Sequence, residues 1–328
     1  MAIGFGVVGL GMGYSRAKQV INTKDAELVA VCDINEERLK KACEDFKCEG
    51  YSDFDQMLKN KDVNVVYVMT PSGTHLDFGK KAAEAGKHVI TTKPMEVSVQ
   101  RCKEFIRVCK KNNVELVVDF EMRYRTELQQ LKAAIESGEL GEIIFAEARC
   151  KWWRTQEYYN AGGWRGTWKY DGGGSAANQG IHVIDLLVWL CGDPKNILFS
   201  RYGVFAHDIE TEDLTVAIME LENGNFASIT TTTNHHLDDD YGVAISFENG
   251  SISNQTGTLK IKMKDGTERL KTEIPDLPRN AAEDMIRTLE KRETPYVSGH
   301  EGLRSIKLLD RIYKKGKKYY RNKSKKTA

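Results

Sequence analysis

Short apolar runs alternate with amphipathic stretches along the first third of the chain. The apolar runs predict strands over residues 3–9, 27–32, 63–69, 88–90 and 115–119. The amphipathic stretches predict helices over residues 15–22, 35–46, 76–85 and 98–111. Strands that are apolar throughout and separated by helices are typical of a parallel sheet covered on both faces. Residues 1–122 are therefore expected to form a doubly wound α/β domain.

One edge of this sheet is the expected ligand site. Right-handed crossovers bring the carboxyl ends of parallel strands, and the loops that follow them, to the same edge. Three such loops carry polar residues or glycines: the stretch after the first strand, the turn that begins at Thr70, and the segment that contains Lys93. We expect these three loops to line one crevice.

From about residue 142 the pattern changes to an alternation of apolar and polar positions. It predicts a long strand over 143–153 and hairpins over 213–233, 241–254 and 258–272, which turn at Asn223-Gly224, Asn249-Gly250 and Asp265-Gly266. Residues 123–328 are therefore expected to form an α+β domain with an open, mostly antiparallel sheet and helices on one face. A final helix over 301–314 is expected to return toward the first domain. The uncovered face and edge favour a homo-oligomer, a dimer or tetramer, that assembles through this sheet.

Composition and charge narrow the class of protein. The chain has 328 residues, of which 41% are hydrophobic and 29% charged, and its formal net charge is +1. This balance is typical of a soluble two-domain protein and favours neither nucleic acid nor a membrane as partner. The basic run Lys314–Lys318, followed by Arg321, Lys323, Lys325 and Lys326, is interpreted as a solvated, frayed end.

Cysteine use and apolar runs indicate the compartment. The seven cysteines are scattered and form no CxxC pair, which is typical of reduced thiols in a cytosolic protein. Met1 to Phe5 run directly into an apolar strand, with no basic region or cleavage site. No apolar run approaches the ~18 to 20 residues that span a bilayer. We expect a cytoplasmic protein.

A glycine-rich turn follows the first strand and carries the cofactor signal. Gly9, Gly11 and Gly13, with Met12 among them, let the backbone approach a pyrophosphate, which then lies over a helix N-terminus. The spacing departs from GxGxxG, because Tyr14 occupies the third glycine position and Gly13 comes one residue early. A simple strand-to-helix turn is the alternative interpretation.

Asp33 strengthens the cofactor interpretation, because it closes the second strand where an acidic residue binds the ribose of a dinucleotide. The alternative is that Asp33 caps the helix beginning near Glu36. Strand context and spacing favour the cofactor role. A carboxylate at this position repels the 2′-phosphate of NADP, so NAD is the expected cofactor. Arg38 lies close enough in sequence to keep NADP as the less favoured alternative.

Four stretches share their order and spacing with one known family. They are the VVGLGMG turn with Asp33, Thr70-Pro71-Ser72 with His75, Thr92-Lys93-Pro94, and GGGSAANQGIHVIDLL from Gly172 to Leu187. Arg123-Tyr124 and residues 138–141 match the transition between the two domains of that family. On these motifs, over essentially its whole length, the chain resembles the Gfo/Idh/MocA oxidoreductases. The resemblance implies an N-terminal Rossmann domain, a C-terminal substrate domain and nicotinamide chemistry.

The resemblance also implies roles for particular residues. Lys93 and His182 are expected to be catalytic, and Thr70, Pro71, Ser72 and His75 to lie against the nicotinamide or its ribose. An imidazole, with its ordinary pKa of ~6.5, suits the removal of a hydroxyl proton as hydride leaves. An ammonium group can bind the reacting oxygen, stabilise alkoxide charge or share the proton transfer. We expect Lys93 and His182 to meet over the nicotinamide ring.

The predicted helix around His182 offers partners for the imidazole. Asn178, His182 and Asp185 are spaced i, i+4 and i+7, so they share one face. Asp185 is placed to orient the imidazole, and Asn178 to bind a substrate hydroxyl. The alternative is that Asn178 only caps the helix and His182 is a satisfied core histidine.

Two departures from the family pattern bear on the substrate. Thr92 replaces the usual glutamate before Lys-Pro, and Asn178 replaces an aspartate found in inositol dehydrogenases. Members that act on glycosides and nucleotide sugars often carry asparagine in this context. The resemblance therefore favours oxidation of a ring hydroxyl, with C3 preferred, on a sugar, glycoside or nucleotide sugar.

Residues 152–168, which precede the triple glycine at 172–174, are rich in aromatic side chains. This segment, here called the aromatic loop, is expected to contact the substrate. Aromatic faces suit the apolar face of a pyranose, and arginine binds hydroxyls or a carboxylate. We expect Tyr159 and Arg165 to contact the substrate, while some tryptophans of the loop pack in the core. His235 is expected to reach the pocket. No metal is expected at His235-His236 and Asp238–Asp240, since hydride transfer to NAD requires none.

Two other classes of function remain open. An NAD-using glycosidase would act by transient oxidation and elimination, and would release free sugar without accumulating NADH. A cofactor-binding sensor would keep the fold without catalysis, which the presence of both Lys93 and His182 disfavours.

Overall fold

A computed structural model describes residues 2–237, 239–255 and 257–320. The chain divides into two compact units: the first contains residues 1–124 and 277–303, and the second the remainder. The boundary near residue 122 was expected, but the assignment of all of 123–328 to the second domain is corrected. Residues 277–303 group with the first unit because Ser298 bridges Val117 and the Val118 N–H donates to the Val297 carbonyl at 2.8 Å.

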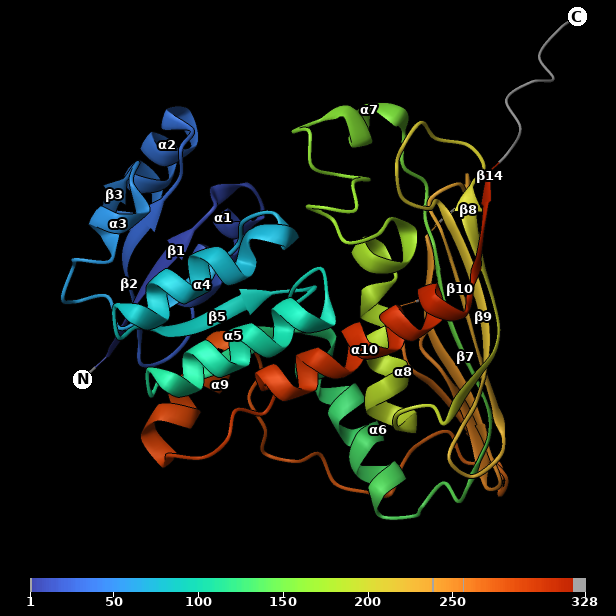
Figure 1. The fold of residues 1–328 in the computed structure, drawn as a ribbon. Helices are drawn as coiled ribbons and strands as arrows, with labels where there is room; N and C mark the ends of the chain where they lie inside the picture. Colours follow the sequence, from blue (N-terminus) through green and yellow to red (C-terminus); the bar gives the residue numbers. More distant parts are fainter. Residues whose placement is uncertain (1, 238, 256, 321–328) are drawn as a thin grey trace, which may run out of the picture. The chain divides into compact units, whose positions relative to one another are not determined.

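The first unit has a parallel sheet with the strand order β3-β2-β1-β4-β5-β6 (Figure 1). Its strands are β1 (Ile3–Val8), β2 (Ala26–Cys32), β3 (Glu49–Tyr51), β4 (Val65–Val68), β5 (His88–Thr92) and β6 (Leu116–Asp119). This order is that of the doubly wound dinucleotide-binding fold, so the expected Rossmann domain is confirmed. The short strand β3 carries no apolar run and was not predicted.

Helices connect the strands of the first unit. They are α1 (Leu10–Ile21), α2 (Glu36–Phe46), α3 (Phe54–Met57), α4 (His75–Glu84), α5 (Val99–Lys111) and α9 (Ala281–Lys291), with one-turn helices η1 (Ser72–Thr74) and η2 (Glu121–Tyr124). Helix α1 begins at Leu10 and not at the expected residue 15, because the glycine stretch itself forms the first helical turn. Helix α10 (Gly299–Lys315) begins in the first unit and continues in the second.

The second unit has a mixed sheet with the strand order β13-β12-β11-β7-β10-β9-β8-β14 (Figure 1). Its strands are β7 (Ile143–Lys151), β8 (Asn196–Val204), β9 (Leu214–Glu220), β10 (Phe226–Thr232), β11 (Asp240–Phe247), β12 (Gly250–Ser253), β13 (Lys260–Met263) and β14 (Lys317–Tyr320). Among the described strands of this sheet, only the β7–β10 and β8–β14 pairs are parallel. The expected open, mostly antiparallel sheet is confirmed.

Two expectations for this sheet are wrong. The turn at Asp265-Gly266 forms, but no return strand follows β13, because the amides of Lys271 and Thr272 donate to the Glu139 carboxylate. The basic tail is not frayed up to Tyr320, because β14 pairs with the open edge of β8. Its Tyr319 ring stacks on Phe205 at a centroid distance of 5.3 Å. The basic residues at 321, 323, 325 and 326 lie outside the described part of the chain.

Helices lie against one face of this sheet, and the other face is open. The helices of the unit are α6 (Thr126–Glu136), α7 (Gln156–Asn160), a π-helical turn η3 (Ser175–Gln179) and α8 (Ile181–Cys191), which packs on β7 and β11. The open face presents four large apolar side chains that are 42–51% exposed: Phe145, Phe199, Ile218 and Phe226. The unit therefore leaves an apolar surface uncovered.

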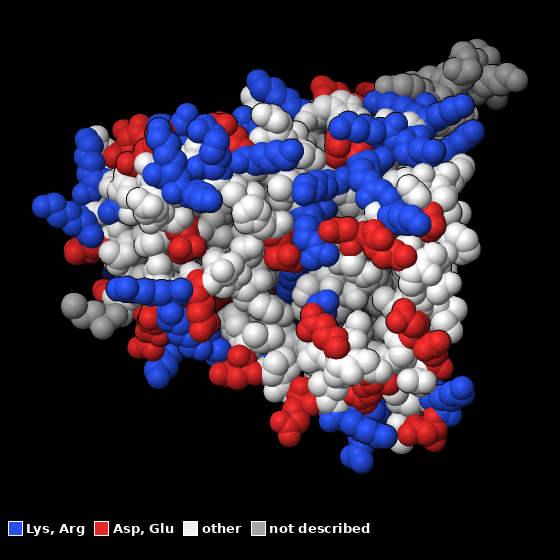
Figure 2. Space-filling view, turned by 60° about the horizontal axis from the view of Figure 1, so that its bottom comes forward, with Lys and Arg blue, Asp and Glu red and all other residues white. Residues whose placement is uncertain are grey.

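On the face drawn in Figure 2, Lys and Arg are more frequent in the upper part, with some Asp and Glu among them, and both signs occur in the lower part. This distribution agrees with the net charge of +1. None of the helices in the described part of the chain has the length and hydropathy of a membrane span. None of the seven cysteines, all of which lie in the described part of the chain, forms a disulfide.

Candidate active site

The three loops expected to share an edge of the first sheet do so. Val8 pairs with Val68, and Val68 pairs with Thr91, so β1, β4 and β5 end side by side. The glycine stretch, the turn at Thr70 and the segment containing Lys93 follow these strand ends. The carboxyl edge of the sheet therefore gathers all three, as the parallel topology requires.

Each glycine of the stretch has its own steric reason. Gly9 has φ +91°, and a β-carbon there would lie 2.7 Å from the Met69 carbonyl oxygen. A β-carbon on Gly13 would lie 3.0 Å from that of Met69, so this glycine provides the close helix-to-strand packing although it comes one position early. At Gly11 the nearest group to such a carbon is the Arg38 guanidinium, at 3.7 Å, which leaves the backbone open to a ligand.

Asp33 fastens the glycine stretch to the sheet. Its carboxylate accepts from the Leu10 N–H at 2.6 Å and from the Asn35 N–H at 2.8 Å. The alternative that Asp33 caps α2 is excluded, because the cap is Asn35, whose side chain accepts from the Arg38 N–H. Each carboxylate oxygen keeps a further lone pair that can accept from a ribose hydroxyl.

These residues fit a dinucleotide. Gly9, the N-cap of α1, has no side chain, and Asp33 takes only the Leu10 N–H, so the next N–H groups of the first turn and the open Gly11 backbone can hold a pyrophosphate. Asp33 would take the ribose. Arg38 lies beside Gly11, where its guanidinium could bind the 2′-phosphate of NADP. The residues present are therefore compatible with both NAD and NADP.

The turn after β4 is braced by His75. This histidine is fully buried, and its Nδ1 and Nε2 lie 3.0 Å and 2.8 Å from the carbonyl oxygens of Pro94 and Thr70. Burial lowers the pKa of His75, although Glu96 and these carbonyls oppose the shift. His75 therefore joins the Thr70 turn to the loop of Lys93. Lys93 itself is half-buried, follows β5 directly and precedes Pro94 through a cis peptide bond.

In the second unit, His182 differs from its neighbours on helix α8 in its exposure to solvent. Every residue of α8 from Ile181 to Leu190 is buried except His182, which is half-exposed. The helix cap is Gly180, so the alternative that Asn178 merely caps it is wrong. Asp185 is buried and accepts from the Ser305 hydroxyl at 2.7 Å. Asn178 lies in the π-helical turn before α8 and donates to Asp171 at 2.6 Å.

Glu212 holds the start of this helical segment. It is fully buried, and residue 212 accepts from three consecutive amides: Gly174 and Ala176 donate to its carboxylate at 2.8 Å, and Ser175 donates to its carbonyl at 2.9 Å. Burial raises the pKa of Glu212 to about 7, against these bonds, which lower it. A β-carbon on Gly174 would lie 1.8 Å from the Glu212 carbonyl oxygen, so only glycine permits this approach.

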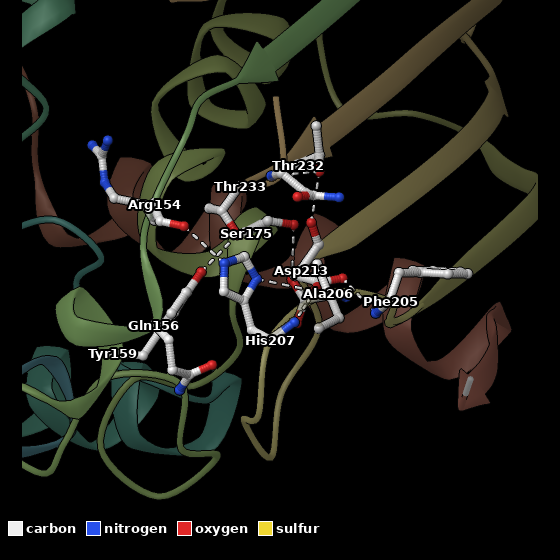
Figure 3. Close-up of polar contacts among 12 residues, drawn as sticks. Arg154, Gln156, Tyr159, Ser175, Phe205, Ala206, His207, Asp213, Thr232 and Thr233 are labelled. Carbon is white, nitrogen blue, oxygen red and sulfur yellow. Dashed lines mark hydrogen bonds and ion pairs between the residues drawn. The ribbon is translucent and has the colours of Figure 1, made fainter. Parts of the chain in front are cut away.

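His207 and Asp213 hold the aromatic loop from the other side (Figure 3). His207 is 6% exposed, and its Nδ1 lies 3.1 Å from Asp213 and its Nε2 2.8 Å from the Arg154 carbonyl oxygen. Since both neighbours are acceptors, the imidazole satisfies both only when doubly protonated. Burial lowers the pKa of His207, but the hydrogen bonds to Asp213 and Arg154 and the aspartate charge bring it above its ordinary value.

The candidate substrate residues differ in their placement. Tyr159 is 4% exposed and its hydroxyl lies 2.7 Å from that of Thr233, so it packs behind the loop (Figure 3). Its neighbour Tyr158 is half-exposed. Arg165 is half-buried, with its guanidinium over the Tyr158 and Trp164 rings. His235 is half-buried, and its backbone N–H donates to the Trp152 carbonyl at 3.1 Å.

Several site-forming residues escaped the sequence analysis. Glu212, Asp213, His207 and Asp171 are all buried. Glu212 and His207 have partners 36 and 53 residues away, and Asp213 and Asp171 bind across loops that follow no periodic pattern. One local feature pointed to Glu212 and Asp213: these two acidic residues lie at the start of a predicted apolar strand, where burial of a charge is unusual. Among the described residues, no group of His, Cys, Asp and Glu is arranged to hold a metal ion. Asp238, part of the cluster weighed for that role, lies outside them.

Comparison with known families agrees with this geometry. Residues 3–120 match an oxidoreductase family with an NAD-binding Rossmann fold, and residues 128–253 match the GFO/IDH/MocA C-terminal domain. The chain belongs to the Gfo/Idh/MocA family. The resemblance drawn from its motifs is confirmed.

The names of proteins similar to this chain describe different reactions. Inositol 2-dehydrogenase of Salmonella typhimurium is 31% identical over 232 residues, which is 68% of this chain and 65% of that enzyme. A 2,7-anhydro-N-acetylneuraminate hydratase of Mediterraneibacter gnavus is 25% identical over 79% of this chain and 70% of its own length. The WlbA dehydrogenase of Bordetella pertussis, solved with NADH and UDP-GlcNAcA, is 31% identical with a TM-score of 0.84 over 96% of each chain.

Glu212→Gln is expected to change how stability depends on pH. The folded-state pKa of the carboxyl, about 7, lies above the unfolded value of ~4.5, so the wild type loses stability as the pH rises between these values. A glutamine side chain does not titrate. Its amide NH₂ would face the backbone N–H of Gly174 or Ala176, which is also a donor, so one of the two hydrogen bonds is lost. The stability advantage of the wild type should be largest near pH 4.5 and shrink by up to about 3 kcal/mol by pH 8. Urea unfolding across this range checks it, with the exposed Glu222→Gln as control.

His207→Gln is expected to show its cost at acidic and neutral pH. The raised pKa of His207 means that its stabilisation is complete below pH ~6.5 and is lost as the pH rises through the folded-state value. The pKa of Asp213 is lowered, so this carboxylate stays charged throughout that range. We expect a deficit of about 1–3 kcal/mol at pH 6 that narrows by pH 9. An equal deficit at both pH values, or the same behaviour in the exposed His300→Gln control, would contradict the assignment.

Proposed function

We propose that the protein is a cytoplasmic, NAD-dependent oxidoreductase that oxidises a ring hydroxyl, preferably C3, of a sugar, glycoside or nucleotide sugar. The observation that carries this proposal is the half-exposed imidazole of His182 at the head of an otherwise buried helix. It occurs in a family member that also presents a glycine stretch and Lys93 along one sheet edge. Alcohol oxidation needs a dinucleotide cradle, a group that stabilises the reacting oxygen and a base.

The residues take the following roles in this proposal. His182 removes the hydroxyl proton, and Lys93 binds the reacting oxygen as alkoxide charge develops. NAD, when bound, supplies the acceptor for the hydride. Thr70, Pro71 and Ser72 lie along the nicotinamide end, and His75 keeps their turn in place through the Thr70 carbonyl.

Two observations support a glycoside or nucleotide sugar as substrate. Asn178 is held by Asp171 at 2.6 Å, so its amide is fixed beside the start of α8, where it can meet a sugar hydroxyl. The Bordetella WlbA dehydrogenase, 31% identical over 96% of each chain, was solved with a nucleotide sugar, UDP-GlcNAcA. We extend that substrate class to this chain.

Assembly through the open sheet is part of the proposal. Phe145, Phe199, Ile218 and Phe226 expose apolar surface on the face opposite α8, and an apolar patch of this kind marks an interaction site. We expect a dimer or tetramer in solution. Light scattering after size exclusion at micromolar concentration checks this, and a monomeric mass would contradict it.

A second candidate is favoured by the hydratase relative. Its reaction is not a net oxidation, which agrees with a mode of action in which a sugar is oxidised, undergoes elimination and is reduced again. The same side chains serve this mode, because His182 and Lys93 again handle the proton and the oxygen. Product analysis separates the two: net oxidation accumulates NADH, whereas the second mode yields altered sugar without it.

Lys93→Ala and His182→Ala are each expected to lower turnover by ~10² or more, because each removes a group that acts only as the transition state develops. Substrates are first identified by screening sugars, glycosides, nucleotide sugars and polyols for NADH formation. Fluorescence titration should show that both variants still bind NADH. Unchanged turnover in both variants would remove the catalytic assignment.

A further inference from the structure

Two arginines of the aromatic loop share one tyrosine ring. The guanidinium of Arg154 lies 5.3 Å from the ring centroid of Tyr158, and that of Arg165 lies 4.6 Å from it. All three side chains are half-buried. Cation–π contact with one ring stabilises each arginine, but it neutralises neither charge.

Neither guanidinium has a carboxylate partner in the described part of the chain. Arg154 donates to the Trp153 carbonyl at 2.8 Å, and Arg165 donates to the Ala161 carbonyl at 3.0 Å. A guanidinium has five N–H donors, so most donors of both groups are unused within the described residues. In contrast, Arg149 and Arg304 of the same unit pair with aspartates at 2.8 Å and 3.2 Å.

One of the unused donors, the Nε of Arg165, is itself buried. It has no acceptor among the described residues. A buried donor without an acceptor destabilises the fold unless a ligand satisfies it. An oxygen-rich anion would accept from this atom and from its neighbours at the same time.

Buried groups hold the backbone of both arginines. His207 binds the Arg154 carbonyl at 2.8 Å, and Figure 3 shows the guanidinium of Arg154 pointing away from that bond. Asp171 accepts from the N–H of Gly166, the residue after Arg165, at 2.8 Å. Buried ionisable side chains therefore fix the backbone from which the two arginine side chains extend.

The tyrosine connects this pair to the helix that carries His182. Gln179, which is 3% exposed, donates to the Tyr158 hydroxyl at 3.0 Å and lies three residues before His182. Asp171 also bonds to Asn178, so both arginine segments are tied to the same helical turn. The charge pair lies next to the proposed substrate site within one unit.

We propose that Arg154 and Arg165, arranged around Tyr158, bind an anionic group of the substrate, either a ring carboxylate or the phosphates of a nucleotide sugar. Both anions offer the paired oxygens that a guanidinium binds with two N–H groups. This inference rests on the proposed function, because it assigns a charge to the substrate of that site. It predicts that neutral sugars are poor ligands.

Matched ligand pairs test the inference and separate the two sources of charge. Methyl glucoside against methyl glucuronide isolates the carboxylate, and N-acetylglucosamine against UDP-GlcNAc isolates the phosphates. Calorimetric titration of the NADH-bound protein at low salt gives the affinity of each ligand. In at least one pair the anionic member should bind about 10-fold or more tightly, as expected for charge-assisted bonds.

Substitution then assigns the preference to the two arginines. Arg154→Gln and Arg165→Gln should each lower the ratio of anionic to neutral affinity about 10-fold, while Arg165→Lys, which keeps the charge, should retain part of it. Arg269→Gln, at an exposed arginine, is the matched control and should leave the ratio unchanged. Circular dichroism verifies that each variant is folded.

The outcomes distinguish this inference from the proposed function. Equal affinities within both pairs, or a preference that survives both glutamine variants, overturn the anion site even if neutral sugars yield NADH. A preference that disappears in the arginine variants, in a protein that forms NADH from no ligand, supports the anion site and removes the oxidoreductase activity. Binding lost equally for neutral and anionic ligands shows a structural role and also overturns the inference.

Discussion

The buried carboxylate of Glu212 is the constraint on which the substrate-binding unit depends. It takes two amides at the start of the π-helical turn, and its own backbone carbonyl takes the amide between them. The path of residues 174–180, and therefore the place where α8 begins, follows from these bonds. Because His182 is the second residue of α8, its position is fixed by a side chain remote in sequence.

The candidate site residues of the two units are positioned by different interactions. In the first, parallel pairing alone brings three loops to one edge, and glycines let backbone approach backbone. In the second, buried ionisable groups do this work: Glu212 holds the helix start, and His207 with Asp213 holds the aromatic loop. Ionisable groups with shifted pKa values gather where function needs them, and here they surround the proposed substrate residues.

The sequence predicted elements whose signal is local. The apolar strands of the first unit and the hairpin at Asn223-Gly224 lie where periodicity and turn chemistry put them. Local signals failed where a distant partner decided the outcome. Glu139 takes the amides that a return strand after β13 would have used, and β8 offers an open edge that turns a basic tail into a strand. Tyr159 and Tyr158 look alike in sequence, yet only tertiary packing buries the first and leaves the second at the surface.

By itself, the sequence determined the Rossmann fold, the family and the candidate catalytic pair, because apolar periodicity and spaced motifs are properties of short segments. Tertiary structure alone decided that Asn35 and not Asp33 caps α2, that Gly13 serves the packing role one residue early, and that two arginines meet at one ring without an acidic partner. The physical reason is that burial, charge pairing and steric contact depend on distances in the folded chain, as between Asp33 and Leu10 or between Gly13 and Met69. No periodicity encodes those distances.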